Sequence, residues 1–161
     1  MKKFIVFACL AWCFACQALI LQGRVVKVAD GDTITILDVD MVQHKIRLSG
    51  IDAPEKNQAF GWRSKHQLGL MVFGQWVSVE TQKKDKYGRQ VGKVLVQGVD
   101  ANLAQIKNGL AWHYTAYAKE QSMQDRAEYS DAQTHARALQ LGLWQDPQPV
   151  PPWDYRRSKK K

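Results

Sequence analysis

The sequence has no cysteine beyond residue 16: Cys9, Cys13 and Cys16 are the only three among its 161 residues. The rest of the chain therefore has no disulfide framework, no thiol nucleophile and no cysteine-based zinc site. A bound metal must be held by oxygen or histidine, and the four histidines show no metal-ligand spacing. The chain also lacks an internal repeat, and its length suits one domain with a core of its own.

The N-terminal segment contains the apolar run "FIVFACLAWCFAC", which is shorter than the roughly 20 residues that a membrane-spanning helix needs. The run follows Lys2 and Lys3 and precedes a small-residue exit, which is the layout of a secretory signal peptide over residues 1–18. We expect cleavage after Ala18 and a secreted or periplasmic protein. An uncleaved membrane anchor and a lipid on Cys16 are the alternatives.

The formal net charge of +8 is unevenly distributed along the chain. Without Lys2 and Lys3, 21 basic residues accompany 15 acidic ones, and the C-terminal "RRSKKK" supplies five of the 21. The body of the chain is therefore nearly neutral, and residues 146–161 form a Pro-rich, then basic tail that we expect to be extended or disordered. Such a tail suits non-specific contact with nucleic acid or an anionic membrane, and equally a solubilising role.

Between the two termini, residues 19–145 are predicted to form one domain that combines strands and helices. Alternating or valine-rich stretches predict five short strands, at 23–29, 33–37, 44–49, 76–82 and 91–98. Apolar residues at helical spacing predict three helices, at 59–74, 100–109 and 122–144. Short antiparallel strands of this kind indicate a small barrel or a sandwich. Trp76, Trp112 and Trp144 are expected to pack in the core or at an end of the barrel.

Polar clusters lie at the strand ends: "DGDT" at 30–33, Arg47 with "DAPE" at 52–55, and "KKDKYGR" at 83–89. Each cluster alone has an ordinary explanation as a solvated turn or a surface ion pair. A small barrel, however, can bring strand ends together although they are far apart in sequence. The clusters are therefore candidates for one shared site.

Such a site would suit phosphodiester chemistry. Asp32 and Asp52 are hard oxygen donors that favour Ca²⁺ or Mg²⁺, although the spacing is not that of an EF-hand. Arg47 and Arg89 carry guanidinium forks that match phosphate oxygens. Glu55 is a carboxylate that can orient or deprotonate an attacking water.

Four motifs, "VADGDTITI", "IRLSGIDAPE", "DKYGR" and "NGLAW", occur in an order and at spacings that resemble the staphylococcal nuclease (thermonuclease) family. The resemblance covers about residues 23 to 144. It implies an α+β fold, an OB-type five-stranded β-barrel with three α-helices. It also implies a Ca²⁺-dependent, sugar-non-specific nuclease that hydrolyses phosphodiester bonds of DNA and RNA.

By position in these motifs, the resemblance implies a role for each polar residue of the clusters. Asp32 and Asp52 would be calcium ligands, together with the backbone carbonyl of Ala53, where the family often has threonine. Arg47 and Arg89 would bind the scissile phosphate. Glu55 would be the general base.

The resemblance also implies residues that contact the rest of the nucleotide: Lys86, Tyr87 and Tyr117. A further family tyrosine falls on Thr115 by count, next to Tyr114, so the register is ambiguous at this point. The loop after Pro54 departs from some family members, and contacts to the substrate edge cannot be transferred there.

Two other functions compete with a secreted nuclease. The first is a non-catalytic OB-type nucleic-acid-binding module, but such modules have typically lost the acidic or arginine positions that this chain keeps. The second is an envelope-associated module held by the basic tail or by a lipid at Cys16. We expect no stable protein partner, and we expect a monomer with DNA and RNA as substrates.

Overall fold

The computed structural model describes residues 19–160, so the predicted signal peptide and Cys16 lie outside the described residues. Five strands form the body of the fold: β1 (Leu19–Val28), β2 (Thr33–Leu37), β3 (Gln43–Leu48), β5 (Trp76–Lys84) and β6 (Gln90–Val96). Their order is β3-β2-β1-β5-β6, and a parallel pairing of β3 with β6 closes the sheet into a barrel. The predicted OB-type five-stranded barrel is confirmed.

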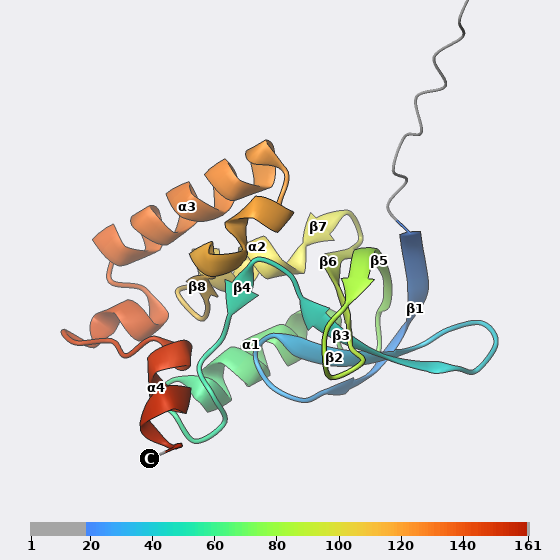
Figure 1. Cartoon of the computed structure of the whole chain (residues 1–161), viewed down its shortest axis with the longest axis horizontal. Coiled ribbons are helices and arrows are strands. Elements are labelled where there is room, and N and C mark those ends of the chain that lie inside the picture. The colour runs from blue at the N-terminus through green and yellow to red at the C-terminus, as the bar shows by residue number, and fades with distance from the viewer. Residues whose placement is uncertain (1–18, 161) are drawn as a thin grey trace, which may run out of the picture.

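Short strands and helices complete the fold around the barrel (Figure 1). The short strands are β4 (Ile51–Asp52), β7 (Val99–Asp100) and β8 (Trp112–His113), and β4 pairs with β8. The α-helices are α1 (Gly61–Val72), α2 (Ala101–Lys107), α3 (Met123–Ala138) and α4 (Pro152–Ser158). The 3₁₀ segments are η1 (Thr115–Glu120) and η2 (Gly142–Gln145). Within residues 19–160, none of the helices has both the length and the apolar character that crossing a membrane requires.

The core lies inside the barrel and under α2 and α3. Alternation along the strands points one face inward, so that Val77 and Val79 of β5 are buried and Trp76 is half exposed. The buried apolar set includes Val25, Ile34, Ile36, Ile46, Leu48, Val94, Ile106 and Tyr129. Trp76, which was expected in the core or at an end of the barrel, is not in the core, because it lies on the outer face of β5 and is half exposed. Trp112 and Trp144 are buried as predicted and contact each other edge to face.

The third predicted helix is shorter than its apolar pattern suggested. It ends at Ala138, and Leu139, which lies within the predicted range 122–144, is 55% exposed. Gln140 and Gly142 then adopt positive φ angles of 51° and 54°, which a right-handed helix cannot contain. Leu143 reaches the core from η2 instead of from the helix.

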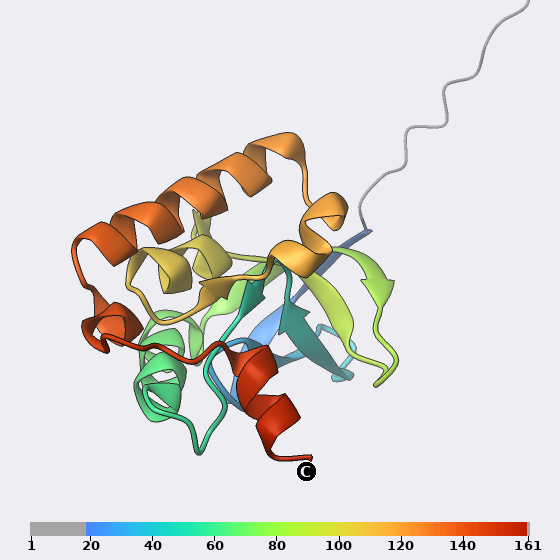
Figure 2. The same cartoon turned by 60° about the vertical axis from the view of Figure 1, so that its left-hand side comes forward.

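The C-terminal segment is not extended throughout, as the sequence had suggested. Residues Pro152–Ser158 form α4, which has proline at its first position, Asp154 in its first turn, and Arg156 and Arg157 in its last turn. Proline suits the first position because the N–H there has no partner within the helix. The negative charge in the first turn and the positive charges in the last turn interact favourably with the helix dipole. Figure 2 shows that α4 lies against the domain beside β4.

Candidate active site

The centre of the candidate site is Arg47, whose guanidinium group joins two buried carboxylates. Its Nη2 lies 2.9 Å from Asp52 Oδ1 and 3.1 Å from Asp32 Oδ2. Its Nη1 donates to the carbonyls of Leu48 and Ile51, at 2.9 and 3.0 Å. Because these contacts bring one arginine and two aspartates from different strand ends to one place, the predicted convergence of the first two polar clusters occurs in the structure.

The turn between β3 and β4 makes this convergence possible. Gly50 has a φ of 70°, a left-handed conformation that residues with a Cβ rarely adopt. A Cβ at Gly50 would also lie 2.4 Å from the side-chain nitrogen of Gln121. The chain can therefore reverse sharply at this glycine, and the side chain of Arg47 at the end of β3 reaches Asp52 in β4.

The loop that carries Asp32 is held from two sides. The buried side chain of Gln105 in α2 donates to the carbonyl of Gly31 at 2.8 Å. On the other side, the backbone N–H of Ala53 donates to Asp32 Oδ2 at 2.7 Å. The Thr33 hydroxyl donates to Asp32 Oδ1 at 3.0 Å. Asp32 is thus fixed by hydrogen bonds to both of its oxygens, an arrangement that orients a carboxylate before any ligand arrives.

Burial makes negative charge costly in this site. It raises the pKa of Asp52 above the ordinary value of an aspartate, although hydrogen bonds and charge from Arg156 and Arg47 oppose the shift. It also raises the pKa of Asp30 to about 6, with the charge of neighbouring Asp32 as a further cause. A site with closely spaced, desolvated carboxylates favours the approach of positive charge.

Glu55 is linked to the aspartates by Arg156, a residue that the sequence had not singled out. Arg156 Nη1 lies 2.7 Å from Glu55 Oε1 and 3.1 Å from Asp52 Oδ1, and its Nη2 lies 2.8 Å from Asp52 Oδ2. Hydrogen bonding to Asp52 raises the pKa of the Arg156 guanidinium above its ordinary value, so the group stays charged. Because Arg156 lies in a run of basic residues at the C-terminus, no signal in its sequence context distinguishes it from a solvated charge.

Arg89 borders the site without touching the two aspartates. Its Nε pairs with Asp85 Oδ2 at 2.7 Å, and its Nη1 donates to the Thr33 hydroxyl at 3.5 Å. The same hydroxyl donates to Asp32, so Arg89 is connected to the acidic centre through one side chain. Hydrogen bonds from Arg89 lower the pKa of Asp85, although partial burial acts in the opposite direction.

The predicted nucleotide-binding side chains lie around this edge. Lys86 and Tyr87 lie in the turn between β5 and β6, where Tyr87 is 72% exposed and the Arg89 guanidinium is 5.4 Å from its ring centre. Tyr117 lies in η1, with its ring 5.0 Å from that of Tyr114. The two tyrosines are therefore neighbours.

The donor set suits a hard divalent cation. Asp32 and Asp52 present buried carboxylate oxygens that share one nitrogen of Arg47, and Glu55 is joined to Asp52 through Arg156. Within residues 19–160, no three acidic, histidine or cysteine side chains form a metal-binding group. A cation here would therefore depend on two aspartates, backbone oxygen and water, which is a ligand set that Ca²⁺ and Mg²⁺ accept. The backbone of Ala53 adjoins Asp32 through its N–H.

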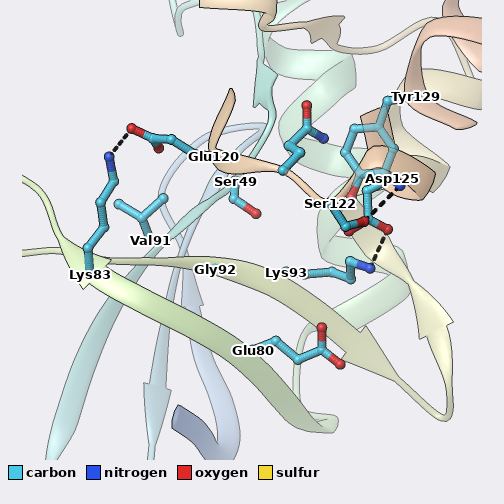
Figure 3. A pocket seen from close by; sticks show the side chains of 11 residues that line it. Ser49, Glu80, Lys83, Val91, Gly92, Lys93, Glu120, Ser122, Asp125 and Tyr129 are labelled. Carbon is cyan, nitrogen blue, oxygen red and sulfur yellow. Dashed lines mark hydrogen bonds and ion pairs between the residues drawn. The ribbon is translucent and has the colours of Figure 1, made fainter. Parts of the chain in front are cut away.

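A separate pocket of about 300 Å³ lies between β6 and the segment that leads into α3 (Figure 3). Four of its charged side chains form two pairs: Lys93 contacts Asp125 at 2.5 Å, and Lys83 contacts Glu120. None of the residues predicted for catalysis or metal binding lines it. The strand-end cluster around Arg47 therefore remains the candidate active site.

The fold and the cluster define a class of protein: an OB-type barrel that carries carboxylates and guanidinium groups at its strand ends. A family model described as "Staphylococcal nuclease homologue" matches residues 45–146. The chain therefore belongs to the staphylococcal nuclease family, as its motifs had predicted.

Curated relatives agree with this assignment. The chain is 41% identical over 137 residues to a Haemophilus influenzae protein named "Uncharacterized endonuclease", with 85% of this chain and 74% of that protein covered. It is 40% identical over 146 residues to "Protein ParB" of Escherichia coli, with 85% and 80% covered. It is 37% identical over 148 residues to a "Micrococcal nuclease" of Shigella flexneri, with 86% and 82% covered.

Proposed function

We propose that this protein is a calcium-dependent nuclease that hydrolyses phosphodiester bonds of DNA and RNA without strong base preference. Membership in a nuclease family supports hydrolysis of nucleic acid. The observation that carries the proposal is the convergence of Asp32, Arg47 and Asp52, with Glu55 linked to Asp52 through Arg156. Contacts to phosphate carry no sequence information, so we expect little discrimination between bases.

In the proposed mechanism, Asp32, Asp52 and the backbone carbonyl of Ala53 would hold a calcium ion. When bound, this ion supplies positive charge that polarises a phosphoryl oxygen and stabilises the charge that develops on it. Arg47 and Arg89 would bind the same phosphate and stabilise the transition state more strongly than the ground state.

Glu55 is the proposed general base. Because it is on the surface edge of the site, a water can reach its oxygens once Arg156 no longer contacts them. It would accept a proton from this water as the water oxygen attacks phosphorus. The bond between phosphorus and one ester oxygen would then break, and the departing nucleotide oxygen would take up a proton from solvent. We expect Lys86, Tyr87 and Tyr117 to contact the nucleotide beside the scissile phosphate, through charge and through exposed aromatic faces.

Plasmid nicking tests this function against the alternative of a non-catalytic OB-type binding module. We expect nicking with added Ca²⁺, none with chelator, and a loss of several orders of magnitude in Glu55→Gln and Arg89→Ala. Glu128→Gln and Arg63→Ala are matched controls, because both residues are exposed and lie outside the site. Binding of DNA without any calcium-dependent cleavage would favour the alternative module.

We also propose that the protein is exported and acts as a monomer. The charged start, the apolar run and the small-residue exit support export. The mass of the protein recovered from the periplasm or the medium tests this. A chain that retains residues 1–18 would instead support a membrane anchor.

A further inference from the structure

Arg156 occupies the two carboxylates that the proposed function assigns to calcium binding and to proton transfer. It contacts both oxygens of Asp52, at 2.8 and 3.1 Å, and Glu55 Oε1 at 2.7 Å. Asp52 Oδ1 also accepts a hydrogen bond from Arg47. Both oxygens of Asp52 therefore have guanidinium partners, and a cation can bind this carboxylate only by replacing at least one of those contacts.

The helix that carries Arg156 is docked on the domain by contacts other than these ion pairs. The Trp153 ring stacks on Tyr114, with ring centres 5.3 Å apart and planes 5° from parallel. The Tyr155 hydroxyl donates to the carbonyl of Asn57 at 2.9 Å. Just before the helix, Gln58 donates to the carbonyl of Val150 at 2.6 Å. These contacts hold α4, and with it Arg156, against the domain. Figure 2 shows the position of α4 on the domain.

The Arg156 side chain can also leave the site. It is 40% exposed, whereas the Asp52 side chain with which it pairs is only 1% exposed. A guanidinium group at the solvent edge can rotate into water, where it is hydrated. The buried Asp52 carboxylate cannot move into water in the same way. Arg156 therefore covers the buried Asp52 carboxylate with a side chain that can be displaced.

We propose that α4 is a built-in inhibitory element whose Arg156 competes with the divalent cation for Asp52 and Glu55. This inference rests on the proposed function. In the closed state the guanidinium group supplies the positive charge that the buried carboxylates require, but it neither polarises a phosphate in the cation's place nor leaves Glu55 free for water. A cation opens the site by taking over Asp52, and the released Arg156 turns to solvent.

Cation affinity measured without nucleic acid tests the competition directly. We would titrate the mature protein, Arg156→Ala and Arg157→Ala with Ca²⁺ by calorimetry and with Tb³⁺ by luminescence. Arg157 is the matched control, because it is the next residue of α4, carries the same charge and is 77% exposed on the Asp154 side. We expect Arg156→Ala to bind the cation about tenfold more tightly, as the loss of a competing charge-assisted contact predicts. The cation affinity of Arg157→Ala should stay within about twofold of that of the unchanged protein, because a surface charge is screened by salt.

A second measurement follows Arg156 itself. The side-chain N–H signals of Arg156, assigned by their loss in Arg156→Ala, should exchange slowly with water before Ca²⁺ is added and rapidly at saturation. Arg156→Gln, which keeps a long polar side chain, should behave like Arg156→Ala in the titration. If urea unfolding shows that Arg156→Ala is poorly folded, Arg156→Gln provides the same test.

The outcomes separate this inference from the proposed function. Equal or weaker cation binding in both Arg156 variants overturns the competition and leaves the nuclease assignment standing. Failure of every variant to bind Ca²⁺ or Tb³⁺ overturns both. In nicking assays, Arg156→Ala should be faster at limiting calcium and equal to the unchanged protein at saturation. A loss of rate at saturating calcium would identify Arg156 as a phosphate-binding residue and refute the inhibitory role.

Discussion

Replacing Arg47 with methionine tests whether this arginine holds the candidate site together. Methionine keeps an unbranched stem of similar length but removes the guanidinium fork. Asp32 and Asp52, whose side chains are 9% and 1% exposed, then lose a shared partner. The carbonyls of Leu48 and Ile51 lose a donor as well.

The expected loss of stability follows from these contacts. Removing one partner of a buried ion pair costs about 3–5 kcal/mol, because the remaining charge stays buried without compensation. Arg156 still contacts Asp52 through both of its oxygens and offsets part of this loss. We therefore expect Arg47→Met to lower the free energy of unfolding by about 3 kcal/mol at neutral pH, the lower end of that range. Combining it with Arg156→Ala should cost more than the sum of the two single changes.

Urea unfolding at several pH values provides the assay, with Arg63→Met as a control at an exposed position. Burial already raises the pKa of Asp52, and removing Arg47 should raise it further. A carboxyl group with a raised pKa in the folded state binds more protons there than in the unfolded state. Stability therefore falls as pH rises through the window between the two pKa values, and is regained as pH is lowered. The deficit of Arg47→Met relative to the unchanged protein should shrink toward acid pH.

Two results would refute this reasoning. A deficit below about 1 kcal/mol at neutral pH would show that the arginine contributes no more than an exposed ion pair does. A deficit that grows as pH falls would show that Asp32 and Asp52 are not the groups left unpaired.

Two further changes probe how the site is supported. Gly31→Ala should lower the free energy of unfolding by about 1–3 kcal/mol in urea and reduce nicking. The reason is that its Cβ would lie 1.8 Å from the Ser64 hydroxyl oxygen and 2.8 Å from the Ala53 Cβ, in the loop that positions the first aspartate. Tyr129→Phe should cost about 1.5–3 kcal/mol in the same assay, with nicking at saturating calcium unchanged, because it removes a hydrogen bond to a carboxylate. The lost donor is the hydroxyl that lies 2.8 Å from Asp100 Oδ2, away from the site.

Gly69→Ala is the control for the glycine change. A Cβ at this position in α1 meets no atom within 4 Å, so alanine should stabilise the helix by about 0.5–1 kcal/mol. If Gly31→Ala were as well tolerated as Gly69→Ala, the loop would not be held as closely as the structure indicates.

The strands were predictable from sequence because their signal is local. Alternation identified the residues of β2 without error and gave the buried face of β5, where Val77 and Val79 point inward. The closure of the barrel has no local signal in the sequence. It depends on a parallel pairing of β3 with β6, between segments about 45 residues apart, which no pattern within either strand encodes. The family resemblance, and not the periodicity, distinguished a barrel from a sandwich.

The errors have a common physical origin. Leu139 and Leu143 continue the apolar spacing of α3, but the helix ends at Ala138 and the positive φ of Gln140 turns the backbone away from its path. Neither leucine therefore lies on a buried face of the helix. Periodicity records which residues can share a face and does not record where the backbone turns. Trp76 was expected in the core or at an end of the barrel, although strand alternation assigns it to the face opposite the buried Val77 and Val79.

The candidate site also has a part that was predictable from local sequence and a part that was not. The turn after β3 places Arg47 and Asp52 five residues apart around a glycine, so their meeting was within reach of sequence reasoning. Arg156 is 104 residues from Asp52. It belongs to a seven-residue helix that is too short to show an amphipathic period. Runs of basic residues at a chain end are usually solvated, whereas Trp153 and Tyr155 dock this one on the domain.

This arrangement links the stability of the fold to its proposed chemistry. The buried carboxylate of Asp52 needs positive charge, and Arg47 and Arg156 provide it from the chain itself. A catalytic cation would serve the same electrostatic need while also acting on phosphate, so it must replace a contact that stabilises the folded state. Arg156→Ala should therefore lower the stability of the protein while tightening its hold on the cation. These opposite effects follow only if one side chain both stabilises the fold and closes the site.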